Sequence, residues 1–362
     1  MILRFALAAL LFVPGCSDGP PARGEAHPPP FEHGASEEPE FEPGPVLRTA
    51  GLDSTLLARA VETATDQGQL HTMLVARGGE LLVERHLRGP GLDRPANVKS
   101  ISKTLLAAIT GYAVEAGYLE GIEVPVLAFF PEHAEGLEAT HGAITVEHLL
   151  TMSSGLQSTS FNNYGAWVVS PNWVRSALRR EMVFEPGTRM LYSTGNSHLV
   201  SAILARASGR STLSLAREAL GEPLGIQLPA WPTDPQGVHF GGNDMLISPR
   251  GLLRFGEMTR KGGVHEGRRV LAERWIDDAW QVRVRSSRDG NGYALGWWHR
   301  ESSGFDVWFA WGYGGQFLFV VPELEMTVVF TSDPWSRERG HNQVLHRVVD
   351  RFLVPAAVET TD

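Results

Sequence analysis

The chain has 362 residues, of which 43% are hydrophobic and 20% are charged, and its formal net charge is -9. This composition is typical of a globular protein with one large domain or two interleaved ones. A negatively charged chain repels phosphate backbones, so we expect no nucleic-acid partner. No apolar run reaches the roughly 18 residues that a membrane-spanning helix needs.

The first 16 residues are typical of an export signal that ends at a site of lipid attachment. Arg4 precedes the apolar stretch from Phe5 to Val13, which is the layout of a secretory signal. Val13-Pro14-Gly15-Cys16 resembles the lipobox of bacterial lipoproteins, in which the cysteine receives lipid. We therefore expect an exported protein that Cys16 anchors to a bacterial membrane, facing the periplasm or the cell exterior. The alternative is a short buried helix with an incidental cysteine.

Cys16 is also the only cysteine, which excludes a disulfide within the chain and a cysteine-based zinc site. The 13 histidines form no His-Glu-x-x-His pattern, so we expect no metal site.

Residues 17–45 are rich in Pro, Gly and Glu without apolar periodicity, which predicts a disordered tether. The folded domain is expected over 46–357. It begins with a helix from about Asp53 to Gln67, whose apolar residues form one stripe. Two strands follow, 72–77 and 80–85, joined by Gly78-Gly79. Glycine permits the positive φ of a tight primed turn, so we expect a hairpin here.

The middle of the chain, about 100–263, has mostly helical patterns, and the C-terminal part returns to strands. These strands are expected at Tyr293 to Trp298, Val307 to Trp311, Phe317 to Val321 and Met326 to Thr331, with a final helix from about Asn342 to Phe352. Strands near both ends with helices between them predict an α+β fold. The sheet would come from about 46–99 and 264–357, and a helical region from about 100–263.

The main candidate for catalysis is the segment Val98-Lys99-Ser100-Ile101-Ser102-Lys103 at the start of a helix predicted to end near Glu115. Residues three apart on a helix share a face, so Ser100 and Lys103 are expected to be neighbours. A serine hydroxyl needs a base to become a good nucleophile, and a lysine whose pKa is lowered can be that base. The alternative is a capping serine beside a solvated lysine.

The amino-acid usage strengthens the catalytic interpretation. Ser-x-x-Lys alone occurs about once by chance in a chain of this size. However, the only lysines are Lys99, Lys103 and Lys261, and every other cation is arginine, which does not release its proton. A lysine three residues after a helix-initial serine is therefore unlike the rest of the chain.

Several ordered segments resemble the serine β-lactamase and D-alanyl-D-alanine-peptidase superfamily, in particular its class C β-lactamase and esterase branch, which includes nylon-oligomer hydrolases. Ser-x-x-Lys is the first motif of that superfamily. The resemblance spans about residues 70–335. It implies a β-lactamase/DD-peptidase-like fold, an antiparallel sheet flanked by helices plus an all-helical region, with the site between them. Other segments that carry it are Ile144 to Leu156, Glu185 to Thr194, Glu222 to Ile226 and Trp311 to Gln316.

The second motif of this branch is Tyr-x-Asn or Tyr-x-Ser, and here it is Tyr192-Ser193-Thr194. The resemblance implies that Tyr192 relays protons between Ser100, Lys103 and the leaving group. A phenol can serve as a base if a nearby ammonium stabilises its phenolate. Thr194 stands where the family has a substrate-contacting amide, and Asn196 is a candidate to substitute for it.

The third motif departs further from the family, which has Lys-Thr-Gly or His-x-Gly. Here the strand reads Trp311-Gly312-Tyr313-Gly314-Gly315 and lacks the cation or imidazole that holds a substrate carboxylate. Some esterases of the branch have Trp at this place. We expect one backbone N–H here to form an oxyanion hole with that of Ser100. Tyr313 is favoured as the donor, with Gly312 and Gly314 as alternatives, and Trp311 is a candidate substrate contact.

These observations predict a serine hydrolase that forms an acyl-enzyme on an ester or small amide and requires no cofactor. A class C-like β-lactamase or a D-alanyl-D-alanine carboxypeptidase is the alternative within the family, because both share the first motif. A non-catalytic, lipid-anchored protein that binds the cell wall is an alternative of another class. The presence of Ser100, Lys103 and Tyr192 together favours the enzyme, because a binding protein does not need all three.

Overall fold

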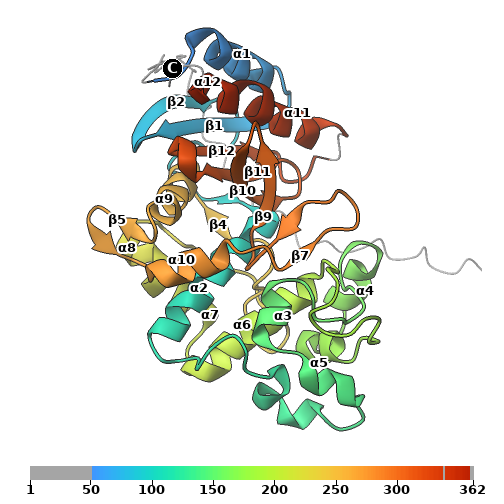
Figure 1. The fold of residues 1–362 in the computed structure, drawn as a ribbon. Helices are drawn as coiled ribbons and strands as arrows, with labels where there is room; N and C mark the ends of the chain where they lie inside the picture. The colour runs from blue at the N-terminus through green and yellow to red at the C-terminus, as the bar shows by residue number, and fades with distance from the viewer. Residues whose placement is uncertain (1–50, 337–338, 359–362) are drawn as a thin grey trace, which may run out of the picture. The chain divides into compact units, whose positions relative to one another are not determined.

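The computed structural model describes residues 51–336 and 339–358. The predicted export signal, the tether at 17–45 and Cys16 lie outside these residues. Within the described part, an eight-stranded antiparallel sheet carries helices on both faces, and further helices form a separate region beyond one face (Figure 1).

The sheet joins the two ends of the domain. Its order is β2-β1-β12-β11-β10-β9-β8-β7, so the N-terminal hairpin pairs with the last strand of the chain. Gly78 and Gly79 both have positive φ in the predicted turn between β1 and β2. The strands are β1 (Leu70–Arg77), β2 (Glu80–His86), β7 (Val284–Arg285), β8 (Gly292–Tyr293), β9 (Trp298–Ser302), β10 (Phe305–Gly312), β11 (Gln316–Val321) and β12 (Met326–Ser332). The short strands β3 (Ala96–Asn97) and β4 (Leu246–Ile247) pair with each other, as do β5 (Val264–His265) and β6 (Arg268–Arg269).

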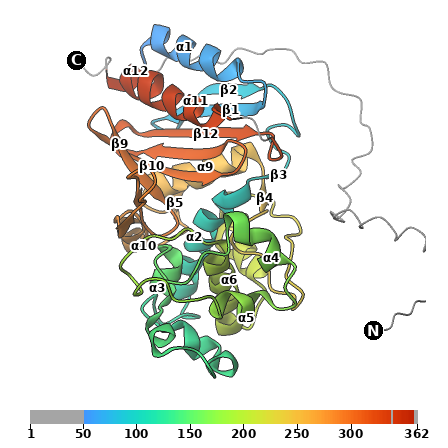
Figure 2. The ribbon, with the colours of Figure 1, turned by 90° about the vertical axis from the view of Figure 1, so that its right-hand side faces the viewer.

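Alternation along the strands divides the core into two apolar clusters. In β1, Met73 and Val75 belong to one cluster and Leu74 to the other. Successive side chains of a strand point to opposite faces, which explains this division. The first face packs against α1 (Ser54–Thr65), α11 (His341–Val348), a π-helical turn (Val349–Leu353) and α12 (Val354–Val358). Figure 2 shows these helices on one side of the sheet and α9 (Pro249–Arg260) on the other.

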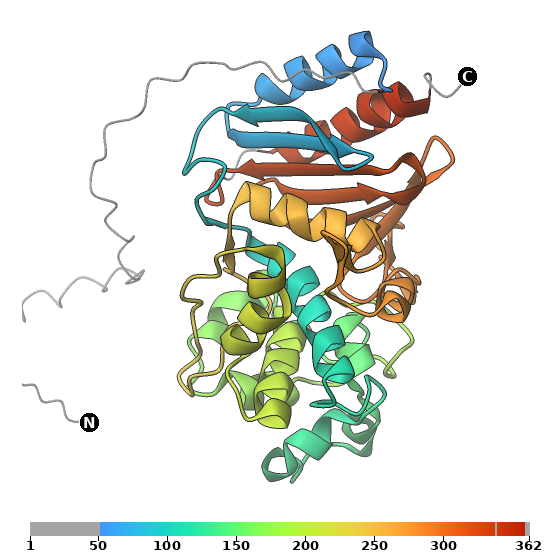
Figure 3. The same cartoon turned by 90° about the vertical axis from the view of Figure 1, so that its left-hand side faces the viewer.

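The helical region is built around α2 (Ser102–Glu115). Eleven of its residues are buried, so this helix is surrounded on nearly all sides rather than amphipathic. The helix ends at Glu115, as predicted, and Gly117 shortly after it has φ of 75°. Figure 3 shows α2 crossing from the sheet into the helical region. Its helical neighbours include α6 (Thr194–Ser208) and α7 (Thr212–Ala216). The remaining helices are α3 (Val146–Leu150), α4 (Tyr164–Val168), α5 (Trp173–Leu178), α8 (Glu222–Leu224) and α10 (Glu273–Ala279).

Most of the predicted elements are confirmed, but the strand expected over Tyr293 to Trp298 is wrong. Tyr293 ends β8 and Trp298 begins β9, and the four residues between them form a turn closed by a hydrogen bond from Ala294 N–H to Trp297 O at 2.9 Å. Gly296 anchors the turn to α2, because its carbonyl accepts a hydrogen bond from Thr104 Oγ1 at 2.6 Å. A contact with a helix far away in the sequence therefore overrides the strand pattern of this segment.

Candidate active site

Ser100 lies in a 3₁₀ turn, Lys99–Ile101, that leads directly into α2. Ser100 is partly exposed, whereas its neighbours Lys99 and Ile101 are buried. Lys103 follows in the first turn of α2, and its Nζ lies 3.1 Å from Ser100 Oγ. The structure thus brings together the serine and the lysine whose spacing predicted that they would be neighbours.

The Lys103 amine occupies an unusual environment for a cation. It is buried, and its Nζ donates a hydrogen bond of 2.5 Å to the carbonyl oxygen of Gly242. Burial lowers the pKa of Lys103 to about 7, although the carboxylate of Asp244 acts in the opposite direction. A large fraction of this side chain is therefore a neutral amine near pH 7, with a lone pair that can accept a proton.

Tyr192 completes the group of three. It lies two residues before α6, its hydroxyl hydrogen-bonds with the Ser100 side chain, and its ring centroid is 5.0 Å from Lys103 Nζ. Trp298 stacks on the Tyr192 ring with centroids 6.0 Å apart. Burial raises the pKa of Tyr192 well above its ordinary value. The raised pKa favours the neutral phenol, and the proton-relay role expected for Tyr192 stays a prediction.

The backbone just before Ser100 is held by a polar network that the sequence did not reveal. Lys99 has φ of 50°, a conformation that side chains with a Cβ rarely adopt. Its N–H donates to Asn97 Oδ1 at 2.8 Å, and its Nζ lies 3.1 Å from Asp244 Oδ1. Asn97 Nδ2 also donates to Asp244 Oδ1, at 2.8 Å. The strained residue is therefore fixed on both its backbone and its side chain.

The glycines of the third motif are explained by packing within the protein. A Cβ on Gly312 would lie 2.3 Å from Val98 O, just before the Ser100 turn, and one on Gly314 would lie 2.5 Å from Asp333 O. A Cβ on Gly315 would lie 2.4 Å from the His341 ring. At these distances any other residue would force the neighbouring atoms to shift. The neighbouring parts of the chain therefore already fill the space that a side chain at these positions would need.

Tyr313 follows the last residue of β10. Within the part of the chain that the structure describes, its backbone N–H has no hydrogen-bond partner, whereas Gly312 lies within the β10–β11 ladder. Trp311 is half-buried beside Trp298, with ring centroids 6.3 Å apart, and its Nε1 has no partner among the described residues.

Thr194 and Asn196, the two candidates from the second motif, are both buried and both engaged with the helical region. Thr194 Oγ1 hydrogen-bonds with Ser160 Oγ at 2.9 Å. Asn196 Oδ1 accepts a hydrogen bond from Ser154 Oγ at 3.2 Å, while its Nδ2 has no partner among the described residues. Among the described residues, the side-chain hydrogen bonds of Thr194 and Asn196 go to Ser160 and Ser154 rather than to Ser100, Lys103 or Tyr192.

Three exposed aromatic side chains lie near Tyr192, Lys99 or the Ser100 turn. Phe161 lies 6.3 Å from Tyr192 between ring centroids, and the Trp335 ring lies 3.6 Å from Lys99 Nζ. Tyr313, the third, is attached to the strand that touches the Ser100 turn. Phe161 and Trp335 were not singled out from the sequence, because nothing local marks an aromatic residue in a loop as a neighbour of a distant serine.

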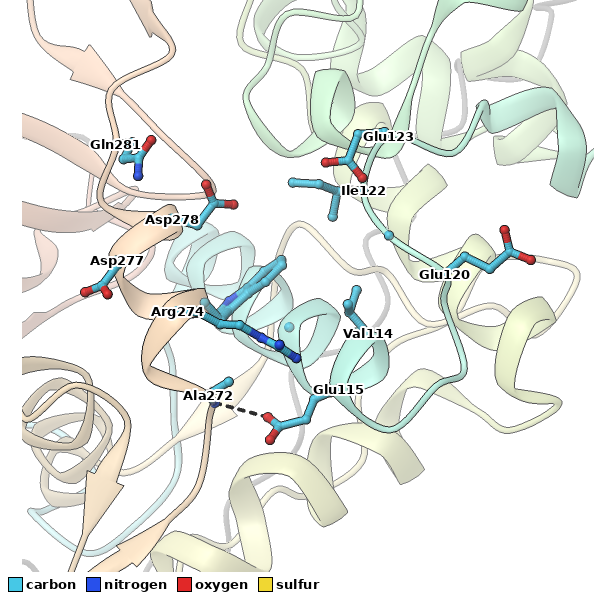
Figure 4. Close-up of a pocket in the computed structure, with 13 residues that line it drawn as sticks. Val114, Glu115, Glu120, Ile122, Glu123, Ala272, Arg274, Asp277, Asp278 and Gln281 are labelled. Carbon is cyan, nitrogen blue, oxygen red and sulfur yellow. Dashed lines mark hydrogen bonds between the residues drawn. The ribbon is translucent and has the colours of Figure 1, made fainter.

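A surface pocket of about 540 Å³ lies elsewhere, between the C-terminal end of α2 and α10 (Figure 4). Glu115 accepts a hydrogen bond from Ala272 N–H there, at 3.1 Å. The pocket holds several carboxylates and Arg274 but no serine, lysine or histidine. Gly111 of α2 lines this pocket and lies about 17 Å from Ser100 along the helix axis, at 1.5 Å per residue. The pocket is therefore separate from the catalytic candidates.

Residues 51–336 and 339–358 hold neither a candidate metal site nor a candidate membrane-spanning helix. No group of three or more His, Cys, Asp or Glu side chains there is arranged to hold a metal ion. No helix in the same part of the chain is long and apolar enough to cross a membrane.

An antiparallel sheet with helices on both faces, a helical region and a serine bonded to a buried lysine define a serine hydrolase of the β-lactamase and penicillin-binding-protein type. The model of the beta-lactamase family matches residues 57–349, and the chain belongs to this family. It is 24% identical over 324 residues to the 6-aminohexanoate-dimer hydrolase of Paenarthrobacter ureafaciens, covering 81% of this chain and 80% of that protein.

Solved structures show the same fold. A penicillin-binding-protein homologue from Caulobacter crescentus superposes with a TM-score of 0.67 at 18% identity, covering 84% of this chain and 97% of the other. A D-stereospecific amidohydrolase from a Streptomyces species superposes with a TM-score of 0.64 at 20% identity, covering 82% and 98%. These matches agree with the resemblance that the motifs indicated.

Proposed function

We propose that the protein hydrolyses an ester or a small amide through an acyl-enzyme formed on Ser100. The observation that carries this proposal is the 3.1 Å contact between Ser100 Oγ and the Nζ of a lysine whose pKa is lowered to about 7 by burial. A serine hydroxyl beside a neutral amine can lose its proton as it attacks a carbonyl.

Lys103 is the general base in this mechanism. Its neutral amine keeps one N–H on Gly242 O and uses its lone pair to take the Ser100 proton. Tyr192, whose phenol stays protonated, passes a proton toward the leaving group and recovers one from Lys103. Water then attacks the acyl-enzyme, with the same groups handling protons in reverse order.

The tetrahedral oxygen needs donors that are in place before the reaction. We assign this role to the backbone N–H groups of Ser100 and Tyr313. Two observations support this choice over Gly312 and Gly314: the Tyr313 N–H has no partner among the described residues, and the Ser100 turn contacts β10.

An ester or small amide is preferred over a β-lactam because of the third motif, which has neither Lys nor His for a substrate carboxylate. The names of two relatives, a 6-aminohexanoate-dimer hydrolase and an amidohydrolase, support a small-molecule substrate with an acyl bond. β-Lactam hydrolysis is the second candidate, favoured by the match to the beta-lactamase family.

The test uses the full chain purified in mild detergent. It is mixed with p-nitrophenyl butyrate or with nitrocefin, release is followed by absorbance, and intact-mass spectrometry detects the acyl adduct. We expect ester turnover that disappears in Ser100→Ala and little nitrocefin cleavage. Rapid nitrocefin turnover would instead make β-lactam hydrolysis the favoured activity. A protein that hydrolyses neither compound and is not labelled by a fluorophosphonate would be a binding protein instead.

A further inference from the structure

One ion pair lies directly beside the proposed nucleophile. Lys99 Nζ is 3.1 Å from Asp244 Oδ1, and the two side chains are 8% and 24% exposed. Trp335 covers the ammonium group, with its ring centroid 3.6 Å away, and is itself 72% exposed. The indole face attracts the ammonium and keeps water from it. Lys99 is thus a cation at the edge of the site, already paired and covered.

The position of Lys99 relates it to the altered third motif. Its Cβ would be 3.1 Å from a Cβ on Gly312, so its backbone lies against the end of β10. Lys99 is therefore a positive charge next to the strand that, in this chain, carries none of its own. It reaches that neighbourhood from the turn before Ser100 rather than from the strand.

The charges around Lys99 determine which substrates its ammonium group can bind. Asp244 neutralises the Lys99 ammonium. It also acts on Lys103, where it raises the pKa against the larger lowering effect of burial. A substrate carboxylate that approached Lys99 would meet the Asp244 carboxylate as well, and it would lose water without gaining a free cation. Two exposed aromatic rings offer apolar contact nearby: Phe161, 67% exposed, lies beside Tyr192, and Tyr313, 53% exposed, follows the strand that contacts the Ser100 turn.

We propose that the Lys99–Asp244 pair, capped by Trp335, is a self-neutralised anion site that makes the enzyme discriminate against substrates with a carboxylate in the acyl chain. The uncharged ester or amide of the same length is then the preferred substrate. This inference rests on the proposed function, because it assigns the substrate class of the Ser100 site.

The pair offers a matched set of variants. Asp244 has φ of 60°, and asparagine tolerates this left-handed conformation as well as aspartate does. Asp244→Asn also keeps an oxygen that can accept the Asn97 hydrogen bond. It leaves the pair with a charge of +1, whereas Lys99→Met leaves -1. The double variant has no net charge, like the wild-type protein, and is the control for changes of shape alone.

The experiment compares p-nitrophenyl hexanoate with mono-p-nitrophenyl adipate, in which a carboxylate replaces the terminal methyl group. The quantity measured is kcat/KM for the adipate ester divided by that for the hexanoate ester, in the full chain in mild detergent, after subtraction of enzyme-free hydrolysis. Both esters share the reacting atoms and the leaving group. A variant that impairs catalysis by Ser100 or Lys103 therefore lowers both kcat/KM values by the same factor and leaves their ratio unchanged.

We expect a wild-type ratio well below one. Asp244→Asn should raise it about ten-fold and Lys99→Met should lower it about ten-fold, as a unit charge several ångströms away in a partly screened site would do. The double variant should return to within about three-fold of wild type. Raising the salt to 0.5 M should shrink the differences between the single variants.

A ratio that is equal in all four proteins would overturn the inference, and so would a double variant as far from wild type as Asp244→Asn. Either result, with release of nitrophenolate that still depends on Ser100, would leave the proposed function intact. No release dependent on Ser100 with either ester would contradict the proposed function, and the inference would fall with it.

Discussion

At the scale of single residues, the proposed chemistry depends on how Lys103 is held. The side chain is buried and hydrogen-bonded to Ser100 Oγ and to Gly242 O. Its amine is therefore oriented toward Ser100 before any substrate binds. Arginine is not able to play this part, because it does not lose its proton at any accessible pH. The rarity of lysine in the chain is consistent with this requirement.

The lowered pKa of Lys103 predicts the pH dependence of catalysis. A base must be unprotonated to act, and burial lowers the pKa of this amine to about 7. We therefore expect kcat/KM for a neutral ester to rise with pH through about 7 and to level off above it. A pH–rate profile from pH 5 to 9 measures this. A profile that still rises about tenfold per pH unit at pH 9, as for a lysine with its ordinary pKa of 10.5, would exclude Lys103 as the base.

The same burial predicts that Lys103 destabilises the fold. The pKa of Lys103 falls from 10.5 to about 7, which costs roughly 4–5 kcal/mol at pH 7, since a tenfold change in a protonation constant corresponds to about 1.36 kcal/mol. Replacement by methionine removes this cost but leaves Gly242 O unpaired, which costs about 1–3 kcal/mol. Lys103→Met should therefore abolish turnover while raising the free energy of unfolding at pH 7 by about 1–3 kcal/mol.

Urea unfolding at several pH values checks this. Between about pH 7 and pH 10 the unfolded chain binds more protons at Lys103 than the folded chain, so the wild-type protein gains stability from this group as pH rises. The advantage of Lys103→Met should be largest below pH 7 and shrink toward pH 10. A variant less stable than wild type at pH 7 would contradict the prediction.

At the scale of elements, the site depends on the contact between the Ser100 turn and the end of β10. Gly312 makes this contact possible, because a Cβ there would lie 2.3 Å from Val98 O. The third-motif turn therefore supports the nucleophile mechanically, in addition to any role of its N–H groups.

Gly312→Ala tests this support. Gly312 is not among the glycines with positive φ, so the expected effect comes from the clash alone. We expect a loss of about 1–3 kcal/mol of stability from overpacking. We also expect at least about a 100-fold loss of kcat/KM, because small displacements of reacting groups are costly. Gly68→Ala, where a Cβ would have open space, is the matched control and should change neither quantity. Unchanged kcat/KM in Gly312→Ala would show that the turn does not position Ser100.

At the scale of the whole molecule, we propose that the hydrolase domain is tethered to a membrane through Cys16 and residues 17–45. The apolar stretch from Phe5 to Val13 and the cysteine after it support this proposal. We expect the full chain, expressed in a bacterial host, to incorporate radiolabelled palmitate and to sediment with membranes. Cys16→Ser should abolish the label and release ester hydrolysis into the soluble exported fraction. Palmitate incorporation that persists in Cys16→Ser would contradict this site.

The sequence by itself determined the local features of this protein. Spacing alone placed Lys103 one turn after Ser100, because helix geometry is regular. Gly78-Gly79 located the N-terminal hairpin, because the turn it needs has a local signature. Resemblance to a family then added Tyr192, whose role no local pattern shows.

The tertiary structure decided the rest, because those features depend on residues distant in sequence. Gly242 and Asp244 reach Lys103 and Lys99 across about 140 residues of chain, and Trp335 reaches Lys99 from the loop after β12. Only the assembled structure shows the burial that lowers the pKa of Lys103, or the pairing that neutralises Lys99. Burial and charge pairing are set by what packs around a side chain, and a linear pattern does not contain that information.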